Sequence, residues 1–308
     1  MAKIIDLVES LLVDKSFLVG IDIIGAQGVT PCVRFAESFS PPAFTYQTYR
    51  ELNRDVGSPW MGTKVILKGS EPHNPLHRIF ERGEDPRFFT YAGKVHLYFQ
   101  IYSEEKYDCK IYIHSIEDNV SLELKFADQR INGKNWGLFE FQDKLLAVYS
   151  CDPLVLAEVR PDGILHEVFK ERPFKAVWGD DLHDSFGGHR CGTAPLQINE
   201  TDFLTFTHIT SEGTSKPFHQ LGAVCFSFDG KIIVRKQITI FREGILLDPY
   251  GVYQKGNQIG VWATLSLGDL HAATSFVQTL LFRFDRDLFL AFLGVRRLGP
   301  ASLAQELP

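Results

Sequence analysis

The chain has 308 residues, of which 44% are hydrophobic and 23% charged, so it can bury a large core as one big domain or two smaller ones. Its net charge of −6 argues against a nucleic-acid partner, because nucleic-acid-binding proteins carry clustered basic residues. The 5 cysteines are scattered and never spaced as C-x-x-C, which indicates neither a disulfide framework nor a zinc cluster. We therefore expect a reducing, cytoplasmic compartment and no metal site.

The first residues predict a short N-terminal helix over 1–15. Asp6, Glu9 and Asp14 interrupt its apolar positions, a spacing that suits an amphipathic helix and breaks the uncharged core of a signal peptide. No uncharged apolar stretch of about 18 residues follows, so we expect no membrane partner. Turn residues are frequent over 39–70, where the sequence does not fix individual strands.

Four later segments share one plan: a polar or glycine-bearing lead, an apolar strand, a short turn and a second apolar strand. These segments are 84–102, 134–150, 191–208 and 250–266. Their starts lie roughly 50 to 60 residues apart, which is the period of four-stranded propeller blades. Between Arg78 and Leu265, runs rich in β-branched and aromatic residues predict strands over 94–102, 109–115, 120–126, 145–150, 155–159, 203–209 and 259–265.

These patterns predict an all-β fold, a five-bladed β-propeller that forms a single domain over 1–308. Four blades correspond to the four repeats, and we expect a fifth, degenerate blade in the first 70 residues. The C-terminal tail over 286–308 contains an apolar run, 288–295, which we expect to pack against the propeller or a partner.

The polar leads of the repeats are expected to converge on one axial pocket. They are Glu84, Asp85, Lys134, Asn135, Arg190 and Asp248. The segment 83–87, Gly-Glu-Asp-Pro-Arg, is the most specific of them, because proline fixes the backbone after two carboxylates and Arg87 can orient a nearby acid. For so short a motif, a turn with a structural Asp–Arg pair is the alternative interpretation.

Groups from separate repeats could together bind an anion. Lys134, Asn135, Arg190 and His208 combine two positive charges, an amide and an imidazole. Taken singly, Lys134 would be a solvated charge and His208 a hydrogen-bonded core residue. Only their equivalent places in successive repeats favour a shared site.

Three further side chains are candidates for contacts with a sugar. Trp136 adjoins the lead residues and could stack on a sugar face, although tryptophan is more often packed in a core. Asp269, with a surface turn as its alternative, and Glu243 could bind sugar hydroxyls.

At these residues the chain resembles glycoside hydrolase family 130, the five-bladed β-propeller β-mannoside phosphorylases and their hydrolase relatives. The resemblance covers 84–269. It includes the D-P-R motif at 85–87, a G-K/R-N-x-x-L-F segment at 133–139, a K/R-x-G-x-x-P segment at 190–195 and a G-x-x-D segment that is similar to 266–269.

The resemblance implies a role for each matched residue. Asp85 would be the catalytic acid, with Glu84 and Arg87 as its supporting, substrate-binding shell. Lys134, Asn135, Arg190 and His208 would bind phosphate, and Asp269 the nonreducing sugar. Phosphorylases carry a further phosphate-binding arginine before a proline at the place where this chain reads Tyr149-Ser150-Cys151.

The implied function is inverting phosphorolysis of a β-mannoside or related glycan, or the reverse glycosyl transfer from a sugar 1-phosphate. A hydrolase of the same fold and a noncatalytic glycan-binding propeller are the alternatives, since a fold alone does not decide activity. The expected partners are an oligosaccharide or a sugar phosphate, with a homo-oligomer allowed. No cofactor is expected beyond inorganic phosphate as a co-substrate.

Overall fold

The chain is mostly β-structure in a computed structural model that describes residues 2–24, 35–37, 44–50, 63–69, 76–81, 83–103, 108–127, 135–171, 189–211, 218–229, 232–239, 246–267 and 276–294. The two helices of these residues are α1 (Ala2–Ser10) and α2 (Arg286–Phe292). The predominance of strands agrees with the expected all-β class. The N-terminal helix is present and ends at Ser10, five residues before the predicted end.

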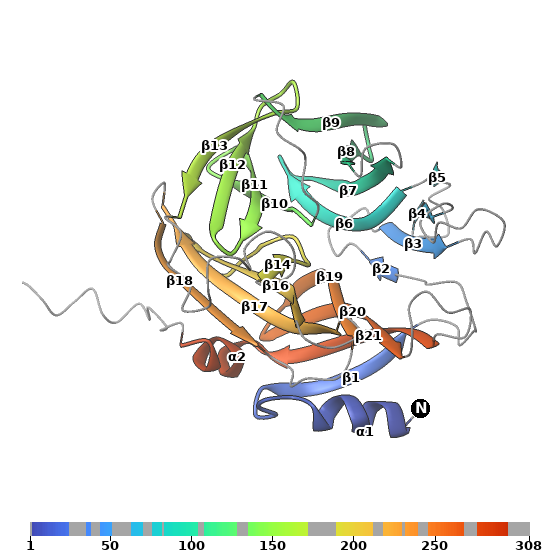
Figure 1. Ribbon diagram of the computed structural model, residues 1–308, viewed down its shortest axis with the longest axis vertical. Coiled ribbons are helices and arrows are strands. Elements are labelled where there is room, and N and C mark those ends of the chain that lie inside the picture. Colours follow the sequence, from blue (N-terminus) through green and yellow to red (C-terminus); the bar gives the residue numbers. More distant parts are fainter. Residues whose placement is uncertain are drawn as a thin grey trace, which may run out of the picture.

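The strands of the described ranges fall into five antiparallel sets, which Figure 1 shows arranged around a common centre. The first set is β2 (Phe35–Glu37), β3 (Phe44–Arg50), β4 (Thr63–Gly69) and β5 (His77–Glu81). The second is β6 (Gly83–Tyr91), β7 (Lys94–Ser103), β8 (Asp108–Ser115) and β9 (Val120–Phe126). The third is β10 (Gly137–Phe141), β11 (Lys144–Cys151), β12 (Leu154–Val159) and β13 (Ile164–Lys170).

The fourth set is β14 (His189–Cys191), β15 (Leu196–Gln197), β16 (Asp202–Ser211), β17 (Phe218–Phe228) and β18 (Ile232–Thr239). The fifth is β19 (Leu246–Lys255), β20 (Gln258–Leu267), β21 (Phe276–Asp285) and β1 (Leu18–Ile24). β13 and β9 pair in parallel and join the second and third sets into one sheet. In each set, the predicted repeat contributes the strands that lie nearest the common centre of the five sets. In the second set these strands are β6 and β7 (Figure 1).

The N-terminal strand β1 corrects the expectation that the first 70 residues form one unit. β1 pairs with β21, the last strand, while β2 to β5 form a set of their own. The early residues therefore serve two sets, and β1 joins the beginning of the chain to its end. The local sequence could not show this, because β1 acquires its partner more than 250 residues later.

Each strand near the centre buries both faces. In β10, Leu138 packs into the cluster shared with the second set, while Phe139 packs into the cluster shared with the fourth. β11 alternates in the same way, with Ala147 and Val148 on opposite sides. Because side chains alternate along a strand, burial on both faces produces the near-continuous apolar runs of the repeats.

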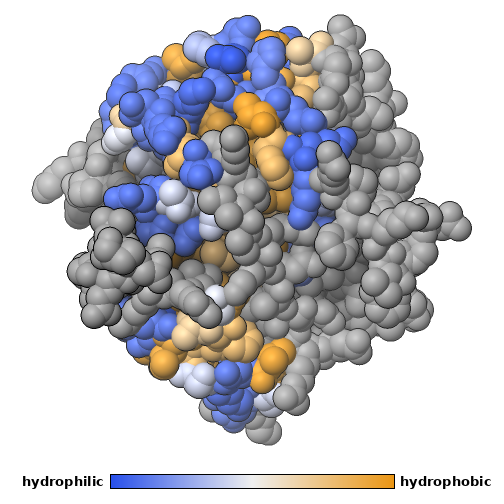
Figure 2. Space-filling view, turned by 90° about the vertical axis from the view of Figure 1, so that its left-hand side faces the viewer, coloured by the Kyte–Doolittle hydropathy of each residue, from blue (hydrophilic) through white to orange (hydrophobic). Residues whose placement is uncertain are grey.

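Outer strands face solvent on one side. His166 and Glu167 of β13 are exposed, and hydrophilic residues cover much of the upper part of the face in Figure 2. Asp285 caps the N-terminus of α2, because its carboxylate accepts a hydrogen bond from the Leu288 backbone N–H at 3.0 Å. Phe289 of α2 is fully buried in a cluster with strands of the fourth and fifth sets. The first part of the predicted tail thus packs on the sheets, and 295–308 lie outside the described residues.

None of the helices in the described part of the chain has the length and apolar character needed to cross a membrane.

Candidate active site

Asp85 lies in a β-bulge near the start of β6. The register of β6 with β7 shifts between Glu84 and Arg87, so Asp85 and Pro86 together lie opposite Phe99 and β6 has one extra residue here. Asp85 has φ +46°, an unusual value for a residue other than glycine. Bulges and strained backbones of this kind are frequent beside active sites, where they aim a side chain.

The Asp85 carboxylate is held from the neighbouring strand. Gln100 in β7 donates a hydrogen bond from Nε2 to Asp85 Oδ2 at 2.8 Å. Asp85 is half-buried, whereas Gln100 is 1% exposed. The sequence offered a signal for Gln100 that was missed: it is the one amide in the apolar and aromatic run of 96–102, and counting back from the Ala92-Gly93 turn places it opposite Asp85. The bulge shifts its observed partner in the ladder to Glu84.

Arg87 joins the second set to the leads of the next two sets. Its Nη1 donates to the backbone carbonyl of Trp136. Its Nη2 donates to Asn135 Oδ1 at 3.2 Å and to the Cys191 carbonyl at 3.0 Å. The guanidinium also lies 5.3 Å from the centroid of the Tyr98 ring. The guanidinium of Arg87 therefore donates to protein acceptors and holds the leads together. The sequence had suggested that it contacts the substrate.

Arg190 lies opposite His208 in the pairing of β14 with β16. Burial lowers the pKa of Arg190, and the carboxylates of Asp248 and Asp85 oppose that shift. The guanidinium remains ionised at any physiological pH. Arg190 is thus close enough to both carboxylates to interact with them electrostatically, as the convergence of the leads requires.

The leads of the fourth and fifth sets are in backbone contact. A Cβ built at Gly192 would lie 2.5 Å from Pro249 Cγ and 2.7 Å from the Pro249 carbonyl oxygen, so only glycine permits this approach. Gly192 follows Arg190 and Pro249 follows Asp248. On the other side, a Cβ at Gly137 would lie 2.8 Å from Cys191 Sγ. These contacts fix the third, fourth and fifth leads against one another.

The predicted sugar contact of Trp136 needs correction. The Trp136 side chain is fully buried and packs edge-on against Phe126 and Tyr149. A ring enclosed in the core presents no face to a sugar. Its backbone N–H instead donates to Tyr98 Oη at 3.3 Å, which helps to hold the lead of the third set in place.

The remaining predicted residues have different outcomes. Glu84, Asn135 and His208 are buried beside the groups described above. Asn135 has φ +67°, which is a second unusual backbone conformation at this place. Lys134, Glu243 and Asp269 lie outside the described residues. Within the described part of the chain, no three His, Cys, Asp or Glu side chains are grouped as metal ligands would be.

A cavity of about 570 Å³ lies at the other ends of the central strands. Its lining includes Thr90 at the end of β6, Phe141 at the end of β10 and Gln254 near the end of β19. Five residues of extended chain separate Thr90 from Asp85, a rise of roughly 16 Å. The cavity is therefore separate from the lead residues.

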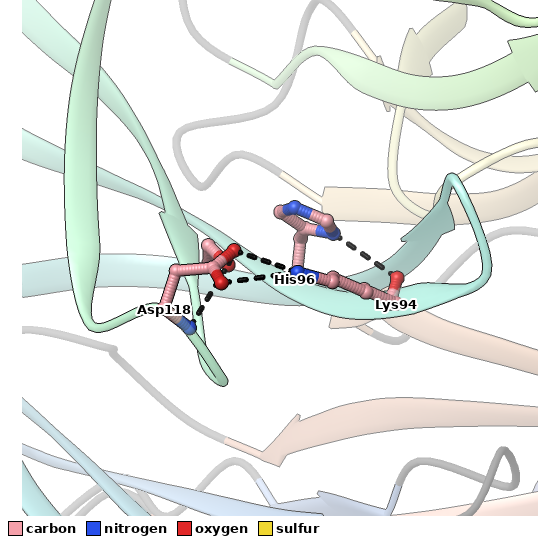
Figure 3. A network of polar contacts seen from close by, with 4 residues as sticks. Lys94, His96 and Asp118 are labelled. Carbon is pink, nitrogen blue, oxygen red and sulfur yellow. Dashed lines mark hydrogen bonds and ion pairs between the residues drawn. The ribbon is translucent and has the colours of Figure 1, made fainter.

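The polar network in Figure 3 also lies at that far end of the second set. Lys94 forms an exposed ion pair with Asp118 at 3.0 Å. The His96 ring donates from Nδ1 to the Lys94 carbonyl at 3.0 Å, since a carbonyl only accepts. Burial lowers the pKa of His96. These contacts join the start of β7 to the β8–β9 turn, and none of them is with a lead residue.

The chain matches no protein-family model, and no curated protein matches its sequence. Among solved structures, it is similar to a β-1,2-mannobiose phosphorylase from Listeria innocua in complex with β-1,2-mannobiose, with 12% identity, a TM-score of 0.49 and coverage of 93% of this chain and 99% of that chain. It is also similar to an α-L-arabinofuranosidase from Lactobacillus brevis, with 13% identity, a TM-score of 0.49 and coverage of 83% and 92%.

A third similar structure is the catalytic domain of a GH62 α-L-arabinofuranosidase from Coprinopsis cinerea, with 10% identity, a TM-score of 0.47 and coverage of 88% and 98%. All three TM-scores are below 0.5, so these similarities assign no activity to this chain.

Proposed function

We propose that the five strand sets are the blades of a five-bladed propeller and that the leads of its central strands form an active site for glycans. The reaction is inverting phosphorolysis of a β-mannoside or a related glycan, or its reverse, with inorganic phosphate as co-substrate. The choice of a mannoside and phosphate as substrates rests on the motif resemblance to glycoside hydrolase family 130.

One observation carries the proposal: leads that are distant in sequence meet in space. The contacts of Arg87 with Asn135 and Cys191 join the leads of the second, third and fourth sets. The close approach of Gly192 to Pro249 adds the lead of the fifth set. As a result, the carboxylate of Asp85 lies within electrostatic reach of Arg190. A proton donor and a cation in one site are the minimum that phosphorolysis requires.

In the proposed reaction, protonated Asp85 gives its proton to the glycosidic oxygen as the bond from that oxygen to the anomeric carbon breaks. A phosphate oxygen attacks the anomeric carbon from the opposite face, and a sugar 1-phosphate forms with inversion. Arg190 and His208 would hold the phosphate together with Asn135 and Lys134. Asp269 and Glu243 would bind sugar hydroxyls.

The test is a panel of mannosyl and glucosyl oligosaccharides incubated with and without inorganic phosphate, with sugar 1-phosphate as the measured product. We expect a sugar 1-phosphate from at least one oligosaccharide, only when phosphate is present. Free monosaccharide without phosphate, and no sugar 1-phosphate in any tube, would rule out phosphorolysis.

A hydrolase of the same fold is the second candidate, and the placement of Asp248 favours it. Inverting hydrolysis needs a second carboxylate to activate water, across a gap of about 6.5 to 9.5 Å from the acid. Asp248 and Asp85 both act on Arg190, so Asp248 is the residue to replace if sugars are released without phosphate. A cytoplasmic location and a homo-oligomeric state remain predictions from the sequence.

A further inference from the structure

The surroundings of Gln100 differ at the two ends of its amide. Nε2 donates to Asp85 Oδ2 at 2.8 Å. Oε1 is buried, and it has no hydrogen-bond partner within the ranges that the structure describes. The side chain is 1% exposed, so bulk water does not readily reach that oxygen. The described hydrogen bonding of this amide is thus directed at Asp85.

An amide at position 100 is unfavourable for stability alone. A buried carbonyl oxygen without a donor is costly, and an apolar side chain of similar volume would avoid that cost. Gln278 in β21 provides the contrast, because its amide is also buried and its Nε2 donates to the backbone carbonyls of Ile24 and Thr279. Gln278 supports the backbone of the fold, whereas Gln100 supports one carboxylate. A buried polar atom without a partner calls for an explanation, and the bond of the same amide to Asp85 supplies one here.

We propose that Gln100 is a positioning residue that holds Asp85 Oδ2 as a hydrogen-bond acceptor, so that the proton transferred by Asp85 is carried on Oδ1. This inference rests on the proposed function. An N–H group facing Oδ2 leaves no room for a proton on that oxygen, and the acid therefore presents its O–H at Oδ1.

The same contact becomes stronger as the reaction proceeds. When the Oδ1–H bond breaks, the proton passes to the leaving oxygen and its electron pair stays on Asp85. The N–H of Gln100 then faces a carboxylate, and hydrogen bonds to ionised acceptors are about twice as strong as neutral ones. A contact that strengthens toward the transition state accelerates the reaction.

Other charged and titratable groups also face Asp85, and the substitutions proposed below leave them in place. Tyr98 in β7 and Arg190 in β14 interact with Asp85 electrostatically, Asp248 in β19 acts through Arg190, and Glu84 and Arg87 flank Asp85 in the sequence of β6.

The test compares Gln100→Met and Gln100→Glu with wild type on the oligosaccharide that gives product in the phosphate panel, over a range of pH. Gln100→Met should lower kcat on the order of 10- to 100-fold, since the acid loses its orientation. The alkaline limb of its pH profile should move to higher pH, because the ionised form of Asp85 loses a donor. Gln100→Glu should move that limb further, because two adjacent carboxyl groups share a proton.

Gln278→Met is the matched control. It removes two hydrogen bonds to the backbone, so it should lower the unfolding temperature and leave the pH profile unchanged. Gln100→Met should shift the alkaline limb of the pH profile without lowering the unfolding temperature. If Gln100→Met does not fold, the isosteric Gln100→Glu variant tests the inference, through the predicted shift of its alkaline limb to higher pH.

Two results overturn the inference in different ways. If Asp85→Asn abolishes turnover but both Gln100 variants keep the wild-type kcat and alkaline limb, Gln100 does not position the acid and the proposed function survives. If Asp85→Asn turns over as fast as wild type, the proposed function and the inference are both wrong.

Discussion

Arg87 donates a hydrogen bond from Nη2 to the backbone carbonyl of Cys191, 104 residues further along the chain, at 3.0 Å. The same side chain bonds Asn135 and the carbonyl of Trp136. One buried guanidinium thus sets the relative positions of the leads of three consecutive strand sets. The geometry around Asp85 depends on this arginine although it is not expected to touch the substrate.

Replacing Arg87 with methionine should destabilise the protein. The carbonyls of Trp136 and Cys191 and the Asn135 amide would lose their donor while buried, which costs about 2–5 kcal/mol in free energy of unfolding. Chemical denaturation would measure the loss. Arg160→Met is the control, because exposed Arg160 pairs with Glu158 at 3.0 Å and should contribute at most about 1 kcal/mol. Equal stability of the two variants would refute the organising role of Arg87.

Arg190→Ala should weaken phosphate use more than sugar use. A hydrogen-bonded charge lost from a phosphate site should raise the KM for phosphate roughly 10- to 100-fold. Initial rates at varied phosphate and saturating glycan would measure this change. Arg283→Ala removes an arginine of the outer part of the fifth set, paired with Asp22 at 3.1 Å, and should leave that KM unchanged. An unaltered phosphate KM in Arg190→Ala would place the anion site elsewhere.

Gly192→Ala should distort the contact between the fourth and fifth leads. The added methyl group would lie 2.5 Å from Pro249 Cγ and 2.7 Å from a backbone oxygen, so the strands must move apart. We expect a lower melting temperature and a reduced kcat, because Arg190 and Asp248 flank this contact. Gly256→Ala is the comparison: an added Cβ meets nothing within 4 Å there, but φ is +57°, so this variant should lose about 1 kcal/mol through backbone strain alone and keep the wild-type kcat. An active, fully stable Gly192→Ala variant would contradict the described approach.

Acid should destabilise the protein through His114. Burial, followed by the nearby charges of Arg78 and His96, lowers the pKa of His114 to about 4 from the ordinary 6.5. Arg78 can only donate to Nε2, so Nδ1 carries the proton and donates to Ser121 Oγ at 2.9 Å. Between pH 6.5 and about 4 the unfolded chain therefore binds one proton more than the native state, and stability is lost as pH falls.

Denaturation at several pH values should show that the free energy of unfolding falls less steeply with falling pH in His114→Gln than in wild type. The amide of glutamine can replace both hydrogen bonds and does not titrate. His166→Gln changes an exposed histidine and should leave the limb as it is. An identical slope in wild type and His114→Gln over this window would show that His114 does not contribute.

Much of the strand layout was readable from the sequence, because buried strands keep their apolar runs. The predicted run 120–126 is β9 to the residue, and 94–102 is β7 less its last residue. The pairing of β1 with β21 was not readable, because it depends on where the end of the chain returns. The five blades remain a proposal.

The candidate site was predictable in its charges and not in its supporting contacts. Polar residues interrupting apolar repeats marked Asp85 and Arg190. Burial decides what a side chain can contact, and the sequence repeats do not reveal which side chains are buried. The Trp136 ring is enclosed in the core, and the Arg87 guanidinium donates its hydrogen bonds to protein acceptors. Gln100 lies in a predicted strand, and the Ala92-Gly93 turn marks its neighbours on the preceding strand, but only the structure shows its hydrogen bond to Asp85.

The role of Asp85 as the catalytic acid is decided by the turnover of Asp85→Asn on the oligosaccharide identified in the phosphate panel, with Asp118→Asn, from the exposed ion pair with Lys94, as the matched control. We expect Asp85→Asn to stay folded, to bind the oligosaccharide and to form sugar 1-phosphate at least about 100-fold more slowly than wild type, while Asp118→Asn is fully active. Undiminished turnover in a folded Asp85→Asn variant would show that Asp85 is not the acid.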